Sequence, residues 1–320
     1  MSILFGILIG FFVLMLLVTI HEFGHFLAAR KNGVRVLEFG ICFPPRAIAW
    51  KKGKDNKWHR LPKSEWDKPQ DSLIFSLNWL PIGGFCQMDG ETATDTRKGT
   101  FGRASFKAKT KILFAGVAAN WLAAFLILTT LAWTGLPKFF DNQFTVFNDT
   151  TITYDERFVS PLELRHSTWS APIVGAGLTL QITGETFAGI GELLWNVASG
   201  VIGQFNFDSH IREQASANLA TAGDSVSGPV GIVGVIFPTF TMAGPANLTF
   251  LSALISISLA CMNVLPIPAL DGGRWLLIAI YKLRNKKLTK ETEERIVGRA
   301  FNVLLFLMLL ITILDIKRFF

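Results

Sequence analysis

The chain has 320 residues, of which half are hydrophobic and only 17% are charged, and its mean hydropathy is +0.39. These values exclude an ordinary soluble protein and favour one that crosses a membrane several times. The formal net charge of +7 does not indicate nucleic acid as a partner, because the Lys and Arg residues stand in loops beside apolar runs rather than in a basic stripe interleaved with aromatic residues.

Four apolar stretches are long enough to cross a hydrocarbon core, which needs about 20 helical residues. They cover residues 3–29, 111–135, 247–281 and 299–316. The third stretch is interrupted by Pro266, Pro268 and a Gly pair at 272–273, which a regular helix cannot carry without losing backbone hydrogen bonds. We therefore predict an all-α membrane protein with about four transmembrane helices, the third of them broken where it lines a protected cavity.

The charge pattern predicts the topology. Residues 30–110 and the loop after residue 281 are rich in Lys and Arg, whereas residues 136–225 are acidic. By the positive-inside rule, both basic loops face the cytoplasm, while the acidic loop and both termini lie outside. We expect a multi-pass protein of the cell inner or plasma membrane, surrounded by the lipid bilayer.

The chain divides into three parts. Residues 1–135 contain the first two spans, with a β-hairpin or small sheet near the cytoplasmic face predicted from the runs 37–43 and 80–85. Residues 136–226 form an acidic extracytoplasmic segment, in which 173–206 reads as an amphipathic interfacial helix rather than a fifth span. Residues 227–320 contain the last two spans.

The first span ends with the motif His21-Glu22-Phe23-Gly24-His25, which fits H-E-x-x-H. On a helix, positions i and i+4 stand about 40° apart on one face, so two imidazoles can bind one Zn²⁺ while Glu22 faces a water at the metal. Such a pattern can arise by chance on a solvated helix. Here it lies in an apolar run, where ionisable residues are expensive and usually functional, and we predict metal-assisted hydrolysis with Glu22 as base.

A catalytic zinc site usually has a third protein ligand. Asp271 is the best candidate, because it is the only acid in the third apolar stretch and stands at its Pro/Gly break. Asp is also a favoured helix N-cap, so a capping role is the alternative. Counting residues from the basic ends of the two spans places Asp271 and His25 in the same, cytoplasmic half of the bilayer, which favours the ligand role.

Two residues of the second span reach the same depth. Gly116 permits close helix packing, and a site role is no better supported than packing alone. Asn120 could donate a hydrogen bond into the site, and we slightly favour that role.

Together these motifs resemble the site-2 protease family of intramembrane zinc proteases, and within it the bacterial regulator of sigma-E protease type. The matching motifs, in chain order, are His21-Glu-Phe-Gly-His25, Leu80-Pro-Ile-Gly-Gly-Phe85, Gly116-x-x-x-Asn120, Ser227-Gly-Pro-Val-Gly-Ile232 and Asn263-x-x-Pro266-x-Pro268-x-Leu-Asp271-Gly-Gly273. This ordered set spans most of the chain and is highly specific.

The resemblance implies an intramembrane zinc metalloprotease that cleaves single-span membrane proteins, such as anti-sigma factors or remnant signal peptides. It implies that His21, His25 and Asp271 bind Zn²⁺ and that Glu22 is the base. The residues expected to contact substrate are Asn263, Pro266, Pro268, Gly83, Gly84, Phe85 and Asn120. The chain departs from the family pattern between the second span and Ser227, where one or two PDZ domains are usual and about ninety residues remain, too few for a complete one.

Two other functions fit parts of the pattern. A non-proteolytic relative could use the same scaffold to bind membrane helices, but the intact set of His21, Glu22, His25 and Asp271 argues against it. A metal transporter could use intramembrane His and Asp residues as a permeation site. Four spans without inverted repeats, and a Glu with no evident role in transport, make that function less favoured.

Overall fold

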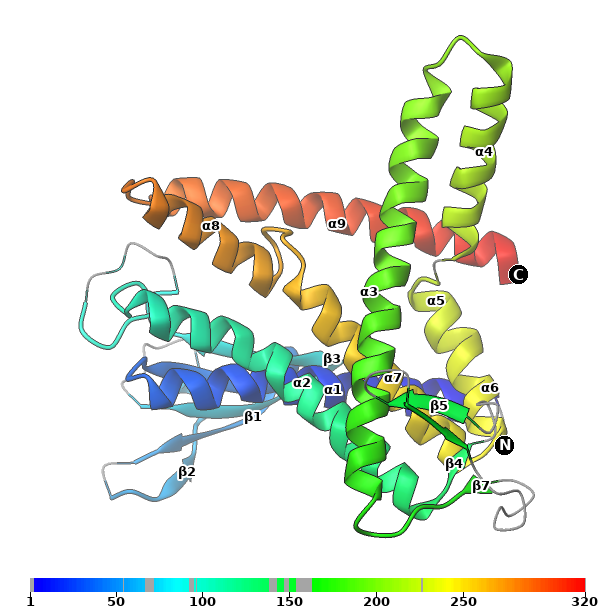
Figure 1. The fold of residues 1–320 in the computed structure, drawn as a ribbon. Helices are drawn as coiled ribbons and strands as arrows, with labels where there is room; N and C mark the ends of the chain where they lie inside the picture. The colour runs from blue at the N-terminus through cyan, green and yellow to red at the C-terminus, as the bar shows by residue number, and fades with distance from the viewer. Residues whose placement is uncertain are drawn as a thin grey trace. The chain divides into compact units, whose positions relative to one another are not determined.

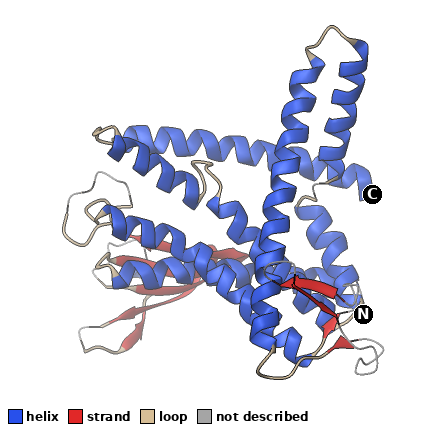
Figure 2. Cartoon of the chain, in the orientation of Figure 1, coloured by secondary structure: helices blue, strands red, loops and turns tan. Residues whose placement is uncertain are grey.

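The computed structural model describes residues 3–53, 55–66, 72–91, 95, 97–137, 143–146, 150–153, 163–225 and 227–319. The chain is mostly helical and carries a small antiparallel sheet (Figures 1 and 2). Among the described residues, four helices are long and apolar enough to cross a membrane. They are α1 (Ile3–Lys31), α2 (Phe106–Thr134), α7 (Pro245–Val264) and α9 (Lys290–Phe319).

The chain folds as two compact units, each described by itself. Unit 1 comprises Met1–Gly10, Ala124–Cys261 and Val303–Phe320, and unit 2 comprises Phe11–Ala123 and Met262–Asn302. The residues that the sequence singles out for metal chemistry all belong to unit 2.

In unit 2, α1 ends in a tight turn. Apart from Thr19 and the ionisable residues of the His21–His25 motif, the helix is apolar on all sides until Arg30 and Lys31, as expected of a segment surrounded by lipid or protein. Gly33 then adopts a positive φ of 73°, which Gly tolerates best, and its N–H donates to the Arg30 carbonyl. The turn sends the chain directly into the sheet.

The sheet consists of β2 (Trp58–Arg60), β1 (Val36–Lys52) and β3 (Ile74–Met88), in that order, with a short 3₁₀ helix η1 (Lys63–Glu65) after β2. Residues 38–41 of β1 pair with 84–87 on one side and with 74–77 on the other, so β3 reverses direction between Leu77 and Gly84. The two predicted strand runs therefore pair with each other, as Ile41 with Gly84, inside strands longer than the sequence indicated.

A hydrophobic core joins the sheet to the ends of α1 and α2. The Phe26 ring lies 5.4 Å from the Phe39 ring and 5.7 Å from the Phe75 ring, both on the sheet. Each buried Phe contributes roughly 1.5–3 kcal/mol, so this cluster fixes the last turns of α1 on the sheet. The three cysteines are free and buried, and burial raises the pKa of the Cys86 thiol far above its usual range.

The predicted break of the third apolar stretch is confirmed. Helix α7 ends at Val264, and α8 (Asp271–Leu283) begins after a six-residue loop, 265–270. Close approach explains the glycines, since a β-carbon at Gly272 would overlap the Val264 carbonyl, and one at Gly273 would overlap the Ile267 carbonyl.

In unit 1, the expected helix over 173–206 is present as α3 (Ala171–Gln204), which folds back along α4 (Ser209–Asp224) as a helical hairpin (Figure 1). Helix α3 is not among the four that qualify as spans. The other strands are β4 (Leu136–Pro137) with β7 (Glu163–Leu164), and β5 (Gln143–Val146) with β6 (Thr150–Thr153). Much of the acidic stretch before Glu163 lies outside the described residues.

The Ser227–Ile232 motif of unit 1 is held by an acid from the last helix. The motif leads into three consecutive short helices, α5 (Pro229–Gly231), η3 (Ile232–Ile236, a π-helix) and α6 (Phe237–Met242). Asp315 of α9 is 2% exposed, and its carboxylate accepts a hydrogen bond of 2.7 Å from the Gly231 N–H. A β-carbon at Gly228 would lie 2.8 Å from the same carboxylate oxygen.

This contact predicts a stability effect. Replacing Asp315 by Ala leaves the buried Gly231 N–H without its charged acceptor, which is expected to lower the free energy of unfolding by about 1.5–3 kcal/mol. Thermal unfolding in detergent measures the effect, with Lys317→Ala, an exposed change on the same helix, as control. Equal melting of Asp315→Ala and the wild type would show that the hydrogen bond is dispensable.

Candidate metal centre

Two histidines face each other on one side of α1. His21 and His25 are 7% and 6% exposed, their rings lie 4.8 Å apart, and the two Nε2 atoms are 3.1 Å apart. The apolar helix supplies the i, i+4 spacing, as the sequence predicts. Two nitrogen lone pairs converge at one point in a buried place.

The third residue comes from α8, 250 positions further along the chain. The Asp271 Oδ2 atom lies 2.9 Å from His21 Nε2 and 3.2 Å from His25 Nε2. The N-cap position of α8 is Leu270, and the Asp271 carboxylate faces the histidines. The structure therefore brings together the three residues predicted as ligands, and it does not give Asp271 the alternative capping role.

The spacing of these three atoms fits a tetrahedral metal ion. Two ligand atoms that each stand about 2.0–2.1 Å from Zn²⁺ are about 3.3 Å apart, and the observed separations are 2.9, 3.1 and 3.2 Å. Two imidazoles and one carboxylate form a donor set typical of catalytic zinc with an open fourth position. Among the described residues, this is the one group of His, Cys, Asp and Glu arranged to hold a metal.

The far ring nitrogen of each histidine has a partner on α2. His25 Nδ1–H donates a 2.8 Å hydrogen bond to the Ile112 carbonyl, which leaves Nε2 as the lone-pair nitrogen. The Asn120 Nδ2 atom lies 3.4 Å from His21 Nδ1, and the Asn120 side chain is fully buried. With its amide oxygen turned to that N–H, Asn120 orients His21 in the same way.

Glu22 stands beside the metal position on the same helix turn. Its carboxylate interacts with both histidines, with Asp271 and with the backbone N–H of Cys86 on β3. It thus interacts both with the three candidate ligands and with the sheet. A carboxylate in that place can accept the proton of an attacking water.

Helices α1 and α2 approach closely at two glycines. A β-carbon at Gly24 would overlap the Ala115 carbonyl of α2. A β-carbon at Gly116 would lie 2.6 Å from the Nε2 atoms of both His21 and His25. The sequence could not decide whether Gly116 serves helix packing or the site. In the structure it serves both, because α1 and α2 touch where the ligand atoms of His21 and His25 converge.

The Gly116 geometry predicts loss of metal in a conservative variant. Gly116→Ala places a methyl group against both ligand nitrogens, so zinc affinity is expected to fall about tenfold or more, as for other changes around metal ligands. Zinc content after dialysis at fixed free zinc measures it. The control is Ala118→Val, which adds volume at an exposed position of the same helix. Full zinc occupancy in Gly116→Ala would contradict the geometry.

Apart from Asn120 on α2, the residues predicted to contact substrate lie on two segments of unit 2. Asn263 is half-buried at the end of α7, while Pro266 and Pro268 lie in the loop before Asp271. These three residues therefore come shortly before Asp271 in the sequence, at the break between α7 and α8.

The second segment is the strand that contains Gly83, Gly84 and Phe85. A β-carbon at Gly83 would lie 2.7 Å from the Val18 side chain, and one at Gly84 would lie 3.1 Å from the Thr19 hydroxyl. The glycines thus let this strand lie directly on α1, one turn before His21. Residues 84–87 pair with β1 along one edge, and no other strand among the described residues pairs with them.

These features define a class of protein. H-E-x-x-H histidines on an apolar helix, with a carboxylate from a broken helix, form the centre of a metal-dependent hydrolase built among membrane-type helices. The profile of peptidase family M50 matches residues 9–309, and the chain belongs to this family, the site-2 proteases. The protein is a zinc metalloprotease of that type, as the sequence predicted.

Individual relatives agree with the family. A predicted zinc metalloprotease of Clostridium perfringens is 27% identical over 352 aligned residues, which cover 94% of this chain and 95% of the relative. The regulator of sigma-W protease RasP of Bacillus subtilis is 34% identical over 164 residues, 51% of this chain and 33% of that protein. The zinc metalloprotease RasP of Bacillus licheniformis is 42% identical over 97 residues, 30% of this chain and 23% of that protein.

Proposed function

We propose that this zinc metalloprotease hydrolyses peptide bonds within or near the transmembrane segments of single-span membrane proteins, as a step of regulated intramembrane proteolysis. Anti-sigma factors and remnant signal peptides are the substrate classes that the resemblance suggests, and one relative is named a regulator of sigma-W protease. The observation that carries the proposal is the convergence of His21, His25 and Asp271 at 2.9–3.2 Å, with Glu22 beside them, among apolar helices.

The mechanism follows from the positions of the side chains. His21, His25 and Asp271 would hold Zn²⁺, which supplies Lewis-acid activation of water and of the scissile carbonyl. Glu22 accepts the proton of the attacking water and later delivers it to the leaving amine, because its carboxylate borders the ligand set. The Ile112 carbonyl keeps the His25 ring in the orientation that the ligand role needs.

Substrate binding requires an extended segment. A helical segment shields its carbonyls, so it must unwind locally before attack, and strand pairing replaces the hydrogen bonds that it loses. The unpaired edge of residues 83–85 lies on α1 next to the metal position and suits this pairing. We assign substrate contacts there to Gly83, Gly84 and Phe85, and on the broken helix to Asn263, Pro266 and Pro268. Asn120, buried beside His21, acts by orienting that ligand.

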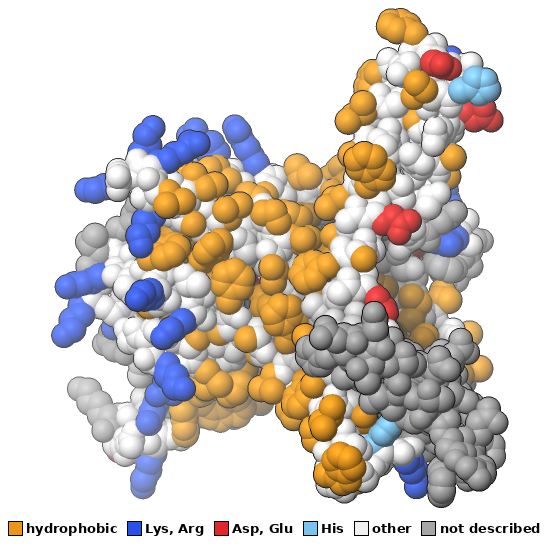
Figure 3. Space-filling view, viewed as in Figure 1, with side chains coloured by type: hydrophobic (Ala, Val, Ile, Leu, Met, Phe, Trp, Pro, Cys, Tyr) orange, Lys and Arg blue, Asp and Glu red, His pale blue; other side chains and the backbone are white. Residues whose placement is uncertain are grey.

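The proposed placement in the membrane follows the charge pattern. Lys and Arg side chains gather over the end of unit 2 where α8 ends and α9 begins (Figure 3). We propose four spans, with this end at the cytoplasmic face, the metal centre near that face and both termini outside. The sheet of residues 36–88 then associates with the cytoplasmic side of the membrane, and the acidic segment 136–226 lies outside without a complete PDZ domain.

Cleavage by the purified protein tests the proposal. The detergent-purified chain is mixed with a tagged single-span substrate, with and without a zinc chelator, and the products are separated by size. We expect cleavage within or beside the span, loss of cleavage on chelation and recovery when zinc is restored.

Other outcomes point elsewhere. Zinc binding without cleavage of any of a panel of membrane helices would favour a binding scaffold. Zinc flux into vesicles that contain the protein would favour a transporter. Cleavage that persists at full chelation would refute the role of the metal.

A further inference from the structure

A cavity of about 500 Å³ with a mixed polar and apolar lining opens in unit 2 beside the end of α1. Three cations line it, namely Arg30, Arg35 and Lys52, together with the Trp58 indole and the Ser72 hydroxyl. None of the described residues that line it is acidic. The metal centre and the proposed substrate strand contribute none of these side chains.

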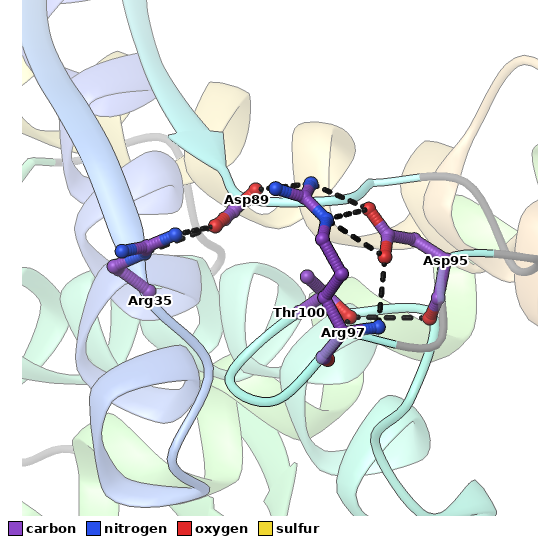
Figure 4. Close-up of polar contacts among 5 residues, drawn as sticks. All are labelled: Arg35, Asp89, Asp95, Arg97 and Thr100. Atoms are coloured by element: carbon purple, nitrogen blue, oxygen red, sulfur yellow. Dashed lines mark hydrogen bonds and ion pairs between the residues drawn. The ribbon is translucent and has the colours of Figure 1, made fainter. Parts of the chain in front are cut away.

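The fold holds one of these cations in place. The Arg35 Nε–H donates a 2.9 Å hydrogen bond to Asp89, which is 5% exposed and which also accepts a 3.0 Å hydrogen bond from Arg97 (Figure 4). Arg97 pairs in turn with Asp95, whose backbone carbonyl accepts from the Thr100 hydroxyl. Arg35 therefore stands on a built support and is not an incidental surface residue.

The other two cations of the cavity have no acidic partner among the described residues. Asp89 and Asp95 balance Arg35 and Arg97, whereas no carboxylate among the described residues lies within ion-pair distance of Arg30 or Lys52. The Arg30 guanidinium instead lies over the Phe26 ring, 5.5 Å from its centre. A cavity with two cations that no described carboxylate pairs with, a third fixed cation and a hydroxyl is suited to an anion that has several acceptor oxygens, such as a phosphate.

The position of the cavity along α1 indicates where the phosphate comes from. Arg30 ends the apolar run of a helix that is long enough to span a membrane. A basic residue at the end of such a run is expected at the level of the phospholipid phosphates. Phe23 and Leu27, 45% and 50% exposed, precede Arg30 by seven and three residues on the same face of α1. This face offers an apolar track that leads directly to the cation.

We propose that the cavity binds the phosphate of an anionic phospholipid, whose acyl chains lie along Phe23 and Leu27 of α1. The headgroup then fixes the end of α1 and the first strand of the sheet at the membrane surface, and Trp58 lies at the interfacial level typical of that residue type.

Native mass spectrometry of the full chain in neutral detergent tests the site with phosphatidylglycerol and phosphatidylcholine as probes. The wild type is expected to retain phosphatidylglycerol in preference to phosphatidylcholine. Lys52→Gln and Arg30→Gln are each expected to weaken retention about fivefold, the effect of one cation near a lipid phosphate. Lys31→Gln, a basic neighbour outside the cavity, is the matched control, and Lys52→Arg should retain the lipid.

Several results would overturn the assignment. Equal losses of phosphatidylglycerol binding in Lys31→Gln and Lys52→Gln would show general attraction to the basic surface. Equal retention of the two lipids would show that the protein does not distinguish the headgroup charges. Inorganic phosphate that binds with the same dependence on Lys52, while phosphatidylglycerol is not retained, would identify a free-phosphate site. Displacement of the lipid by a polyglutamate peptide at equal concentration would favour an acidic protein segment. None of these readouts depends on proteolysis.

Discussion

The Glu22→Gln variant is expected to keep its zinc and to cleave a single-span substrate about 10²–10⁴-fold more slowly than the wild type, the usual contribution of a general base. The substitution preserves the shape of the side chain and removes its ability to accept a proton. The three candidate ligand atoms come from other residues, so metal binding should change little. Single-turnover cleavage and zinc content, measured on the same preparation, separate the two effects.

A matched control for this experiment is Glu192→Gln, which changes an exposed acid on α3 and should cleave at the wild-type rate. Unchanged cleavage by Glu22→Gln would remove Glu22 from the mechanism. Loss of zinc from Glu22→Gln would mean that the carboxylate supports the metal, and the base would have to be sought elsewhere.

The sequence alone predicted the candidate centre because its chemistry is concentrated in short motifs. The i, i+4 spacing of His21 and His25 needs only a helix, and an apolar helix was the strongest prediction available. Asp271 could be added because Pro and Gly residues predict a helix break and because depth can be counted from the basic ends of the spans. Asp271 does lie 2.9 Å from His21 across 250 positions of sequence.

Other features had no sequence signal. The partner of His25 is the Ile112 carbonyl, a backbone atom that any residue type could supply. For Gly116 the sequence allowed a packing role and a site role alike. The folded structure shows that this glycine has both roles, because it lies against both histidines. The pairing of residues 38–41 with two parts of β3 depends on tertiary register, which the alternation of a short run does not specify.

The Asp271→Asn variant separates the two roles that the sequence left open for this residue. Asn caps a helix as well as Asp does, so a capping role predicts normal folding, zinc content and cleavage. A ligand role predicts a loss, because the amide carries no charge to complete the set with His21 and His25 and coordinates zinc weakly. The carboxylate faces both ligand nitrogens at 2.9 and 3.2 Å, so we expect zinc affinity to fall by about 10²-fold or more, with cleavage falling in parallel.

Two comparisons make the result of Asp271→Asn interpretable. Asp55→Asn removes a surface carboxylate that pairs with His59 and should leave both zinc and cleavage unchanged. Saturating zinc should restore part of the cleavage by Asp271→Asn, since Glu22 and the two histidines remain in place. Full zinc content together with lost cleavage would instead mean that Asp271 acts on the substrate, and the third ligand would then have to be another group.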